Sequence, residues 1–212
     1  MSAQEKSSPA AQTTPPRHSD QVHLQWLRDF GVGSFKGMRV LDLGCGSGFI
    51  SDLARIEGAQ LSVGVDIEIP AEGAVAPNTW TFIQANLDLD NWLNEIPAKN
   101  FDLILAFDIL EHLRSPVVFL EQCRSLLSEK GTLFLTTPNT QSLEKMLRPA
   151  TWSGATDPQH RILFTRYSLG FLLSKTGLKP IHIDAPMKSL KWLPRWIQPQ
   201  IGGQLLVQAR PG

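Results

Sequence analysis

One stretch of the chain constrains its fold more than any other: the short, mainly apolar segment 40–43 runs directly into a turn rich in glycine. The glycines are Gly44, Gly46 and Gly48, and a segment with a helical pattern follows them. Glycine allows positive φ angles and lets a ligand approach the backbone where a Cβ atom would collide. The helix after the turn offers free N–H groups and the positive end of its dipole at the same place. We therefore predict a strand, a turn and a helix that bind a nucleotide-like ligand at the carboxyl end of the first parallel strand.

The spacing of these glycines, together with an acid before them, indicates which ligand is bound. Dinucleotide sites read G-x-G-x-x-G, whereas here single residues separate the glycines and Asp42 lies two residues before the first. A carboxylate at that place would be unfavourable beside a pyrophosphate and favourable beside an amino group. The pattern D-x-G-x-G-x-G after an apolar strand resembles the signature of class I S-adenosylmethionine-dependent methyltransferases. The resemblance implies that the methionine end of this cofactor is held by Asp42, Gly44, Cys45, Gly46 and Gly48.

A second acid, Asp66, closes the next predicted strand, residues 61–65, and lies 18 residues beyond Gly48. A carboxylate there can accept both hydroxyl protons of a ribose. An acid at the end of a strand can also simply form a turn. The combined spacing favours the ribose role, with Ile67 next to it in the cofactor site.

The third predicted strand, residues 80–84, leads into a polar loop. In the family that the chain resembles, this place commonly holds an acidic loop that binds the adenine amino group. Asn86 takes that position here, with Leu87 beside it, and Asp88 is the nearby alternative. The segment before this strand, residues 67–79, is short for the usual crossover helix, so we expect a loop there.

Residues 101–107 (FDLILAF) form a near-continuous apolar run, which is typical of a central strand in a parallel sheet. With the residues that follow, the string FDLILAFDILEHL resembles the strand-4 motif of small-molecule methyltransferases of the quinone-biosynthesis-like group. The resemblance implies that Phe107 and Asp108 lie beside the methionine part of the cofactor and near the acceptor. His112 is a candidate general base, because an imidazole suits removal of a phenolic or hydroxyl proton near neutral pH. Alternatively, Glu111 and His112 cap the following turn and line the pocket.

We predict a helix over residues 116–128 and the fifth strand over residues 132–137. A second histidine lies in the polar segment 150–161 after this strand. The run from His160 to Thr165 resembles the H-x-x-x-F-T motif of the same family. Thr165 is suited to cap the helix predicted over residues 167–175, and Gly177 is suited to end it. Because this segment follows the strand on the ligand side, we expect it to form a lid over the acceptor. His160 is therefore a second candidate base, or a residue that positions the lid by hydrogen bonding.

The alternation of strands and helices predicts a single α/β domain of the doubly wound, Rossmann-like type. The family resemblance implies a seven-stranded, mostly parallel sheet whose last strand is antiparallel. We expect residues 1–20 to be a disordered tail, because they are rich in Ser, Gln, Thr and Pro and offer little apolar surface to bury. Residues 21–212 would form the cofactor-binding domain, with a leading helix over residues 21–30.

The composition of the chain narrows its possible partners and its location in the cell. The 212 residues carry 20 basic and 20 acidic side chains, so no overall charge favours nucleic acid as a partner. Two cysteines make no disulfide framework and have no zinc-like spacing, so we expect no metal. No apolar run reaches the roughly 20 residues of a membrane span, and the first residues lack the apolar segment of a secretory signal. We expect a cytoplasmic protein.

One segment of the sequence has two possible roles, one of which is contact with a membrane. Between Ser189 and Ile197, two tryptophans lie beside cationic residues. Such a segment suits peripheral contact with an anionic membrane, and it suits equally a hairpin folded over the acceptor pocket.

The function expected from these features is transfer of a methyl group from S-adenosylmethionine to a small molecule, at a hydroxyl oxygen. The first rival is a domain that binds the cofactor but serves as a scaffold without catalysis. The second is a nicotinamide-dependent oxidoreductase, which the glycine spacing and Asp42 disfavour. The sequence does not identify the acceptor.

Overall fold

The computed structural model describes residues 16–68, 81–89, 91–187 and 200–212. Its strands form one seven-stranded sheet in the order β3-β2-β1-β4-β5-β7-β6. In chain order the strands are β1 (Arg39–Leu43), β2 (Leu61–Asp66), β3 (Thr81–Gln84), β4 (Phe101–Phe107), β5 (Leu127–Pro138), β6 (Leu178–Asp184) and β7 (Gln204–Pro211). Neighbours from β3 to β5 pair in parallel, and β7 is antiparallel to both β5 and β6. The predicted α/β fold with its antiparallel last strand is confirmed.

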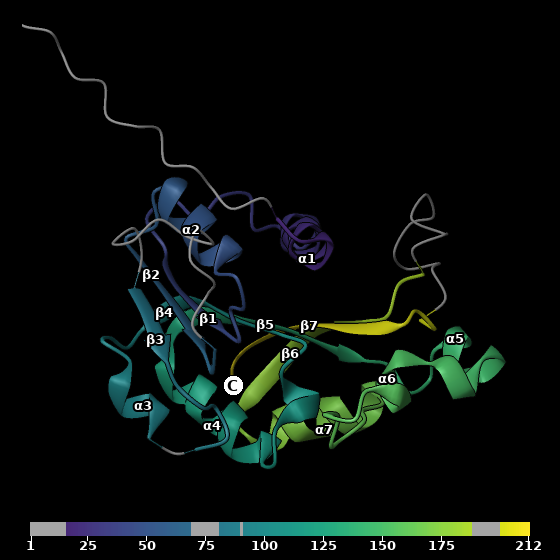
Figure 1. Ribbon diagram of the computed structural model, residues 1–212. Coiled ribbons are helices and arrows are strands. Elements are labelled where there is room, and N and C mark those ends of the chain that lie inside the picture. Colours follow the sequence, from purple (N-terminus) through teal and green to yellow (C-terminus); the bar gives the residue numbers. More distant parts are fainter. Residues whose placement is uncertain (1–15, 69–80, 90, 188–199) are drawn as a thin grey trace, which may run out of the picture.

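Helices cover both faces of this sheet (Figure 1). They are α1 (His18–Asp29), α2 (Phe49–Ile56), α3 (Trp92–Glu95), α4 (Pro116–Leu126), α5 (Leu143–Leu147), α6 (Ser153–Thr156) and α7 (Arg166–Lys175), with the 3₁₀ turns η1 (Leu110–His112) and η2 (Pro149–Thr151). Helices α1 and α2 lie on one face, and α3, α4 and α7 lie on the other.

The core has two layers because the strands alternate their side chains between the two faces. On β4, Leu103 and Leu105 pack into the layer under α1 and α2, while Ile104 and Ala106 pack into the layer on the other face. This strand is the central, doubly buried strand that its apolar run predicted. Its carboxyl end therefore lies in the middle of the sheet, among the carboxyl ends of the other parallel strands.

Two boundaries differ from the prediction. Helix α1 begins at His18 rather than at residue 21, because Arg17 and Asp20 pair in its first turn. Strand β5 begins at Leu127 directly after α4, whereas the sequence predicted helix to residue 128 and strand from residue 132. The strand is bulged at this point, since its register with β4 shifts, and Gly131 approaches the carbonyl oxygen of Phe101 so closely that a Cβ there would lie 2.5 Å away.

Other local predictions are confirmed. Thr165 caps α7 by accepting from the N–H of Ser168, and Gly177 follows the helix with φ of +74°. Most of the expected crossover loop over residues 67–79 and the tryptophan segment 189–197 lie outside the described residues. Among the residues that are described, no helix is both long and apolar enough to cross a membrane.

Candidate active site

The glycine turn leads from β1 into α2 and lies over the end of β2. All three glycines have positive φ: +78° for Gly44, +53° for Gly46 and +75° for Gly48. The N–H groups of Gly44 and Cys45 donate to the carbonyl oxygen of Val65, at 2.7 and 3.1 Å. The turn therefore wraps over the carboxyl end of β2 in a shape that L side chains adopt only with strain.

Asp66 lies directly under this turn. Its Oδ2 accepts from the N–H of Gly46 at 2.7 Å, and its Oδ1 accepts from the N–H of Glu68 at 3.1 Å. Ile67 is 58% exposed beside it, which is unusual for a large apolar side chain next to a polar turn. The structure thus brings together the predicted ribose-binding acid, an apolar surface and the glycine turn.

Asp42 is buried below the same turn. Its side chain accepts a hydrogen bond from the hydroxyl of Ser51 on α2, at 3.2 Å. Burial raises the pKa of Asp42 to about 7, although the bond to Ser51 and the charge of His23 lower it. Burial also raises the pKa of Cys45, so this thiol is a small side chain filling the turn rather than a nucleophile.

The loop after β3 is held by its own polar groups. Oδ1 of Asn86 accepts from the N–H of Asp88 at 2.9 Å, and Oδ1 of Asp88 accepts from the N–H of Arg114 at 2.7 Å. Leu87 packs against the core. This loop begins beside the end of β2, because the N–H of Ala85 donates to the carbonyl oxygen of Asp66 at 2.9 Å.

Helix α1 adds a residue that the sequence analysis missed. Arg17, assigned above to the tail, forms an ion pair with Asp20 at 3.0 Å, and its guanidinium lies over the turn, where a Cβ built on Gly46 would be 2.6 Å from Nη2. The hydroxyl of Ser47 lies 3.5 Å from Asp20. The signal that could have found Arg17 is the acid at residue 20, which belongs to the first turn of an amphipathic helix.

The end of β4 holds a fixed carboxylate. Asp108 has a φ of +53°, and its Oδ1 accepts from the hydroxyl of Thr136 on β5 at 2.8 Å. Its Oδ2 lies 3.3 Å from Nε2 of His23 on α1, whose ring stacks on Phe107 with centroids 4.4 Å apart. Phe107 and Asp108 therefore lie at the end of β4 in contact with α1.

The two candidate bases lie together. The rings of His112 and His160 are 4.7 Å apart in an edge-to-face arrangement. The lid segment is tied to η1, because the N–H groups of Arg161 and Ile162 donate to the carbonyl oxygen of Glu111, at 2.8 and 3.2 Å. Nδ1 of His160 lies 2.9 Å from a backbone carbonyl oxygen of α6, so His160 also ties the predicted lid segment together.

Glu111 completes this cluster. It is 1% exposed, and its Oε2 is buried with no hydrogen-bond partner among the described residues. Burial first, and then the charge of Asp108, raise the pKa of Glu111 to about 8. The ligand atoms of Glu111, His112 and His160 lie within 4.8 Å of one another. One carboxylate and two imidazoles could relay protons or hold a divalent cation.

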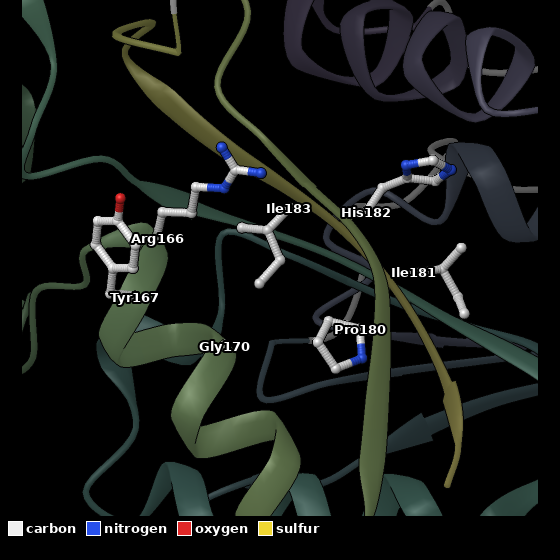
Figure 2. A pocket seen from close by; sticks show the side chains of 7 residues that line it. All are labelled: Arg166, Tyr167, Gly170, Pro180, Ile181, His182 and Ile183. Carbon is white, nitrogen blue, oxygen red and sulfur yellow. The ribbon is translucent and has the colours of Figure 1, made fainter. Parts of the chain in front are cut away.

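A groove of about 320 Å³ lies away from these residues, between α7 and β6 (Figure 2). It is lined by Arg166, Tyr167, Gly170, Pro180, Ile181, His182 and Ile183. Strand β6 is at the opposite end of the sheet from β2 and β3. None of the predicted site residues lines this groove.

Comparison with known proteins decides the family. A family described as a methyltransferase domain matches residues 17–183, which is most of the chain. The chain belongs to this methyltransferase family. The match begins at Arg17, at the start of α1, and it includes the glycine turn, the β4 motif and the lid. The predicted resemblance to class I S-adenosylmethionine-dependent methyltransferases is confirmed.

Several relatives of this chain carry a more specific name than that of the family. It is 29% identical over 145 residues to a ubiquinone biosynthesis O-methyltransferase of Bradyrhizobium diazoefficiens, covering 62% of this chain and 56% of that protein. A protein of the same name from Cereibacter sphaeroides is 29% identical over 190 residues, covering 83% of this chain and 76% of that one. The chain thus spans little more than half the length of the first. A methyltransferase structure from Archaeoglobus fulgidus shares the fold, with a TM-score of 0.67 at 21% identity over 90% of this chain and 93% of that one.

Proposed function

We propose that this methyltransferase transfers a methyl group from S-adenosylmethionine to a hydroxyl oxygen of a small molecule. The observation that carries the proposal is the joint placement of Asp42, the glycine turn and Asp66 at the adjoining ends of β1 and β2. The names of the two relatives support oxygen as the acceptor atom. The acceptor itself is left open.

The residues around the turn fit the cofactor chemically. Burial makes the ionised form of Asp42 costly, and a ligand amino group would offset that cost. Arg17 supplies a cation over Gly46 for the ligand's carboxylate. Asp66 would accept from the ribose hydroxyls, and Ile67 would cover the adenine ring near Asn86.

When bound, S-adenosylmethionine supplies a methyl group on a cationic sulfur, which is already electrophilic. The chain then has to orient the acceptor and exclude water. We assign proton removal from the acceptor hydroxyl to His112, with His160 in ring contact. The lid, tied to Glu111 through backbone bonds, would close this side of the site.

Replacing Asp66 with Ala tests the cofactor assignment directly. We expect S-adenosylhomocysteine to bind the native chain with micromolar affinity and the variant about 2 kcal/mol more weakly, because a charge-assisted hydrogen bond is lost. Titration calorimetry measures both affinities. Asp102→Ala is the control. Asp102 is an exposed acid near the start of β4, where its Oδ2 accepts from the N–H of Arg39 at the start of β1. This variant should leave the affinity unchanged. No binding by the folded native chain would refute the proposed function.

Replacing His112 with Gln tests the base. We expect kcat to fall about tenfold while the affinity for S-adenosylhomocysteine changes less than twofold, because His112 serves the acceptor and not the cofactor. His18→Gln, on the exposed start of α1, should behave as the native chain. Steady-state kinetics with a competent acceptor checks both. If a chelator abolishes activity and a divalent ion restores it, the cluster of Glu111, His112 and His160 holds a metal, and the proton relay is wrong.

A further inference from the structure

His23 connects helix α1 to the end of β4. The ring is 8% exposed and stacks on Phe107 with an interplanar angle of 16°. Its Nε2 lies 3.3 Å from Oδ2 of Asp108, and Trp26, one turn later on α1, contacts it with centroids 5.4 Å apart. A histidine that served only to fill the core would need neither the carboxylate nor this fixed orientation.

Asp108 is held unusually firmly for a residue that follows a strand. Its backbone has a left-handed φ of +53°, which costs free energy in residues other than glycine. Its N–H donates to the carbonyl oxygen and to the hydroxyl of Thr136, both at 3.1 Å, while its Oδ1 accepts from that hydroxyl at 2.8 Å. With Oδ1 bound to β5 and Oδ2 facing His23, the carboxylate has a single orientation.

Electrostatic attraction strengthens the contact between His23 and Asp108. Burial raises the pKa of Asp108, but the hydrogen bond and charge of His23, together with Thr136 and Gln204, outweigh burial and hold that pKa below its ordinary value. Two other titratable groups act here. The pKa of Asp42 is raised by burial, and the charge of His23 offsets part of that rise. The pKa of Glu111 is raised by burial and then by the charge of Asp108.

We propose that His23 is a positioning residue for methyl transfer, which fixes the Asp108 carboxylate and seats α1 over the cofactor site. The inference rests on the proposed function, because it assigns His23 to the same site. His23 would not react itself. It acts through Asp108, and through α1 it also sets the place of Arg17 beside the glycine turn.

The experiment compares His23→Leu and His23→Gln with the native chain in calorimetric binding of S-adenosylhomocysteine between pH 5 and pH 8. We expect His23→Leu to bind five- to tenfold more weakly at pH 7. Its affinity should also fall further toward pH 5 than that of the native chain, because Asp108 loses the interactions with His23 that hold its pKa below the ordinary value. His23→Gln keeps a donor, so it should recover most of the affinity at pH 8 but keep the stronger loss at acidic pH.

A double-mutant cycle shows whether His23 acts through its proposed partner. In an Asp108→Asn background, His23→Leu should change the affinity at pH 7 less than twofold, against five- to tenfold in the native background. An undiminished effect in that background would overturn the inference, as would native affinity of both single variants at every pH. Both outcomes leave the proposed function intact if the native chain binds. Absence of binding by the native chain would instead refute the proposed function itself.

Discussion

A Gly44→Ala variant is expected to lose at least 100-fold in affinity for S-adenosylhomocysteine and about 3 kcal/mol of folding free energy. The φ of +78° at this position costs an L residue about 1–2 kcal/mol. In addition, the new Cβ would collide with the Cδ1 and Cγ1 atoms of Ile109. Ile109 directly follows Asp108, so relief of the collision requires a shift either of the Ile109 side chain beside the end of β4 or of the turn itself.

Gly37→Ala is the matched control for this prediction. Gly37 has nearly the same φ, +74°, but a Cβ there would meet nothing within 4 Å in the described part of the chain. We expect it to lose about 1–2 kcal/mol from backbone strain alone and to bind the ligand as the native chain does. Urea unfolding and calorimetry measure the two effects separately. Adding Ile109→Ala to Gly44→Ala should restore part of the affinity, and equal affinities for the two alanine variants would contradict the role of the turn.

Much of the fold could be predicted because its signals are local or periodic. The apolar run 101–107 predicted the central strand β4 with its observed bounds. The helix signals at Thr165 and Gly177 also predicted the cap and the end of α7. The start of β5 was missed because the prediction placed residues 127–128 in a continuing helix, whereas the chain turns into a bulged strand paired with β4.

Only part of the candidate site could be predicted from the sequence, for a physical reason. Residues fixed by a short motif, such as Asp42 and Asp66, could be chosen from spacing alone. Arg17 and His23 could not, because their contacts reach the glycine turn and Asp108 from a helix distant in sequence. Only tertiary packing brings α1 over those strand ends, and the spacing of residues in the sequence does not predict that packing.

Replacing Asp42 with Asn should make the protein more stable and less able to bind its cofactor. The pKa of this carboxyl is about 7 in the folded chain against 3.8 ordinarily, chiefly because of burial. A folded-state pKa above the unfolded one means that ionisation opposes folding. The stability contributed by this group is therefore fully present below about pH 4 and is lost as the pH rises through 7.

The Asp42→Asn substitution removes the loss of folding stability that ionisation of Asp42 causes. The introduced amide cannot ionise, and its carbonyl oxygen can still accept from the hydroxyl of Ser51, which bonds the native carboxylate at 3.2 Å. Near pH 8 we expect a gain on the order of 2–4 kcal/mol in the free energy of unfolding, shrinking to nothing toward pH 4. The glutamate that titrates in the same direction, Glu111, is present in both proteins, so its contribution cancels.

The affinity should change in the opposite sense. We expect the asparagine variant to bind S-adenosylhomocysteine about 100-fold more weakly, because the buried charge that would pair with the ligand's amino group is gone.

Urea unfolding at several pH values tests the predicted gain of stability, and calorimetry at pH 8 independently tests the predicted loss of affinity. A variant that is less stable than the native chain at pH 8 would show that Asp42 is structural. A more stable variant with undiminished affinity would show that the amino group of the ligand is held elsewhere. Gain of stability together with loss of binding is the result expected of a buried acid kept for its ligand, since the fold alone is better served by a neutral side chain at that position.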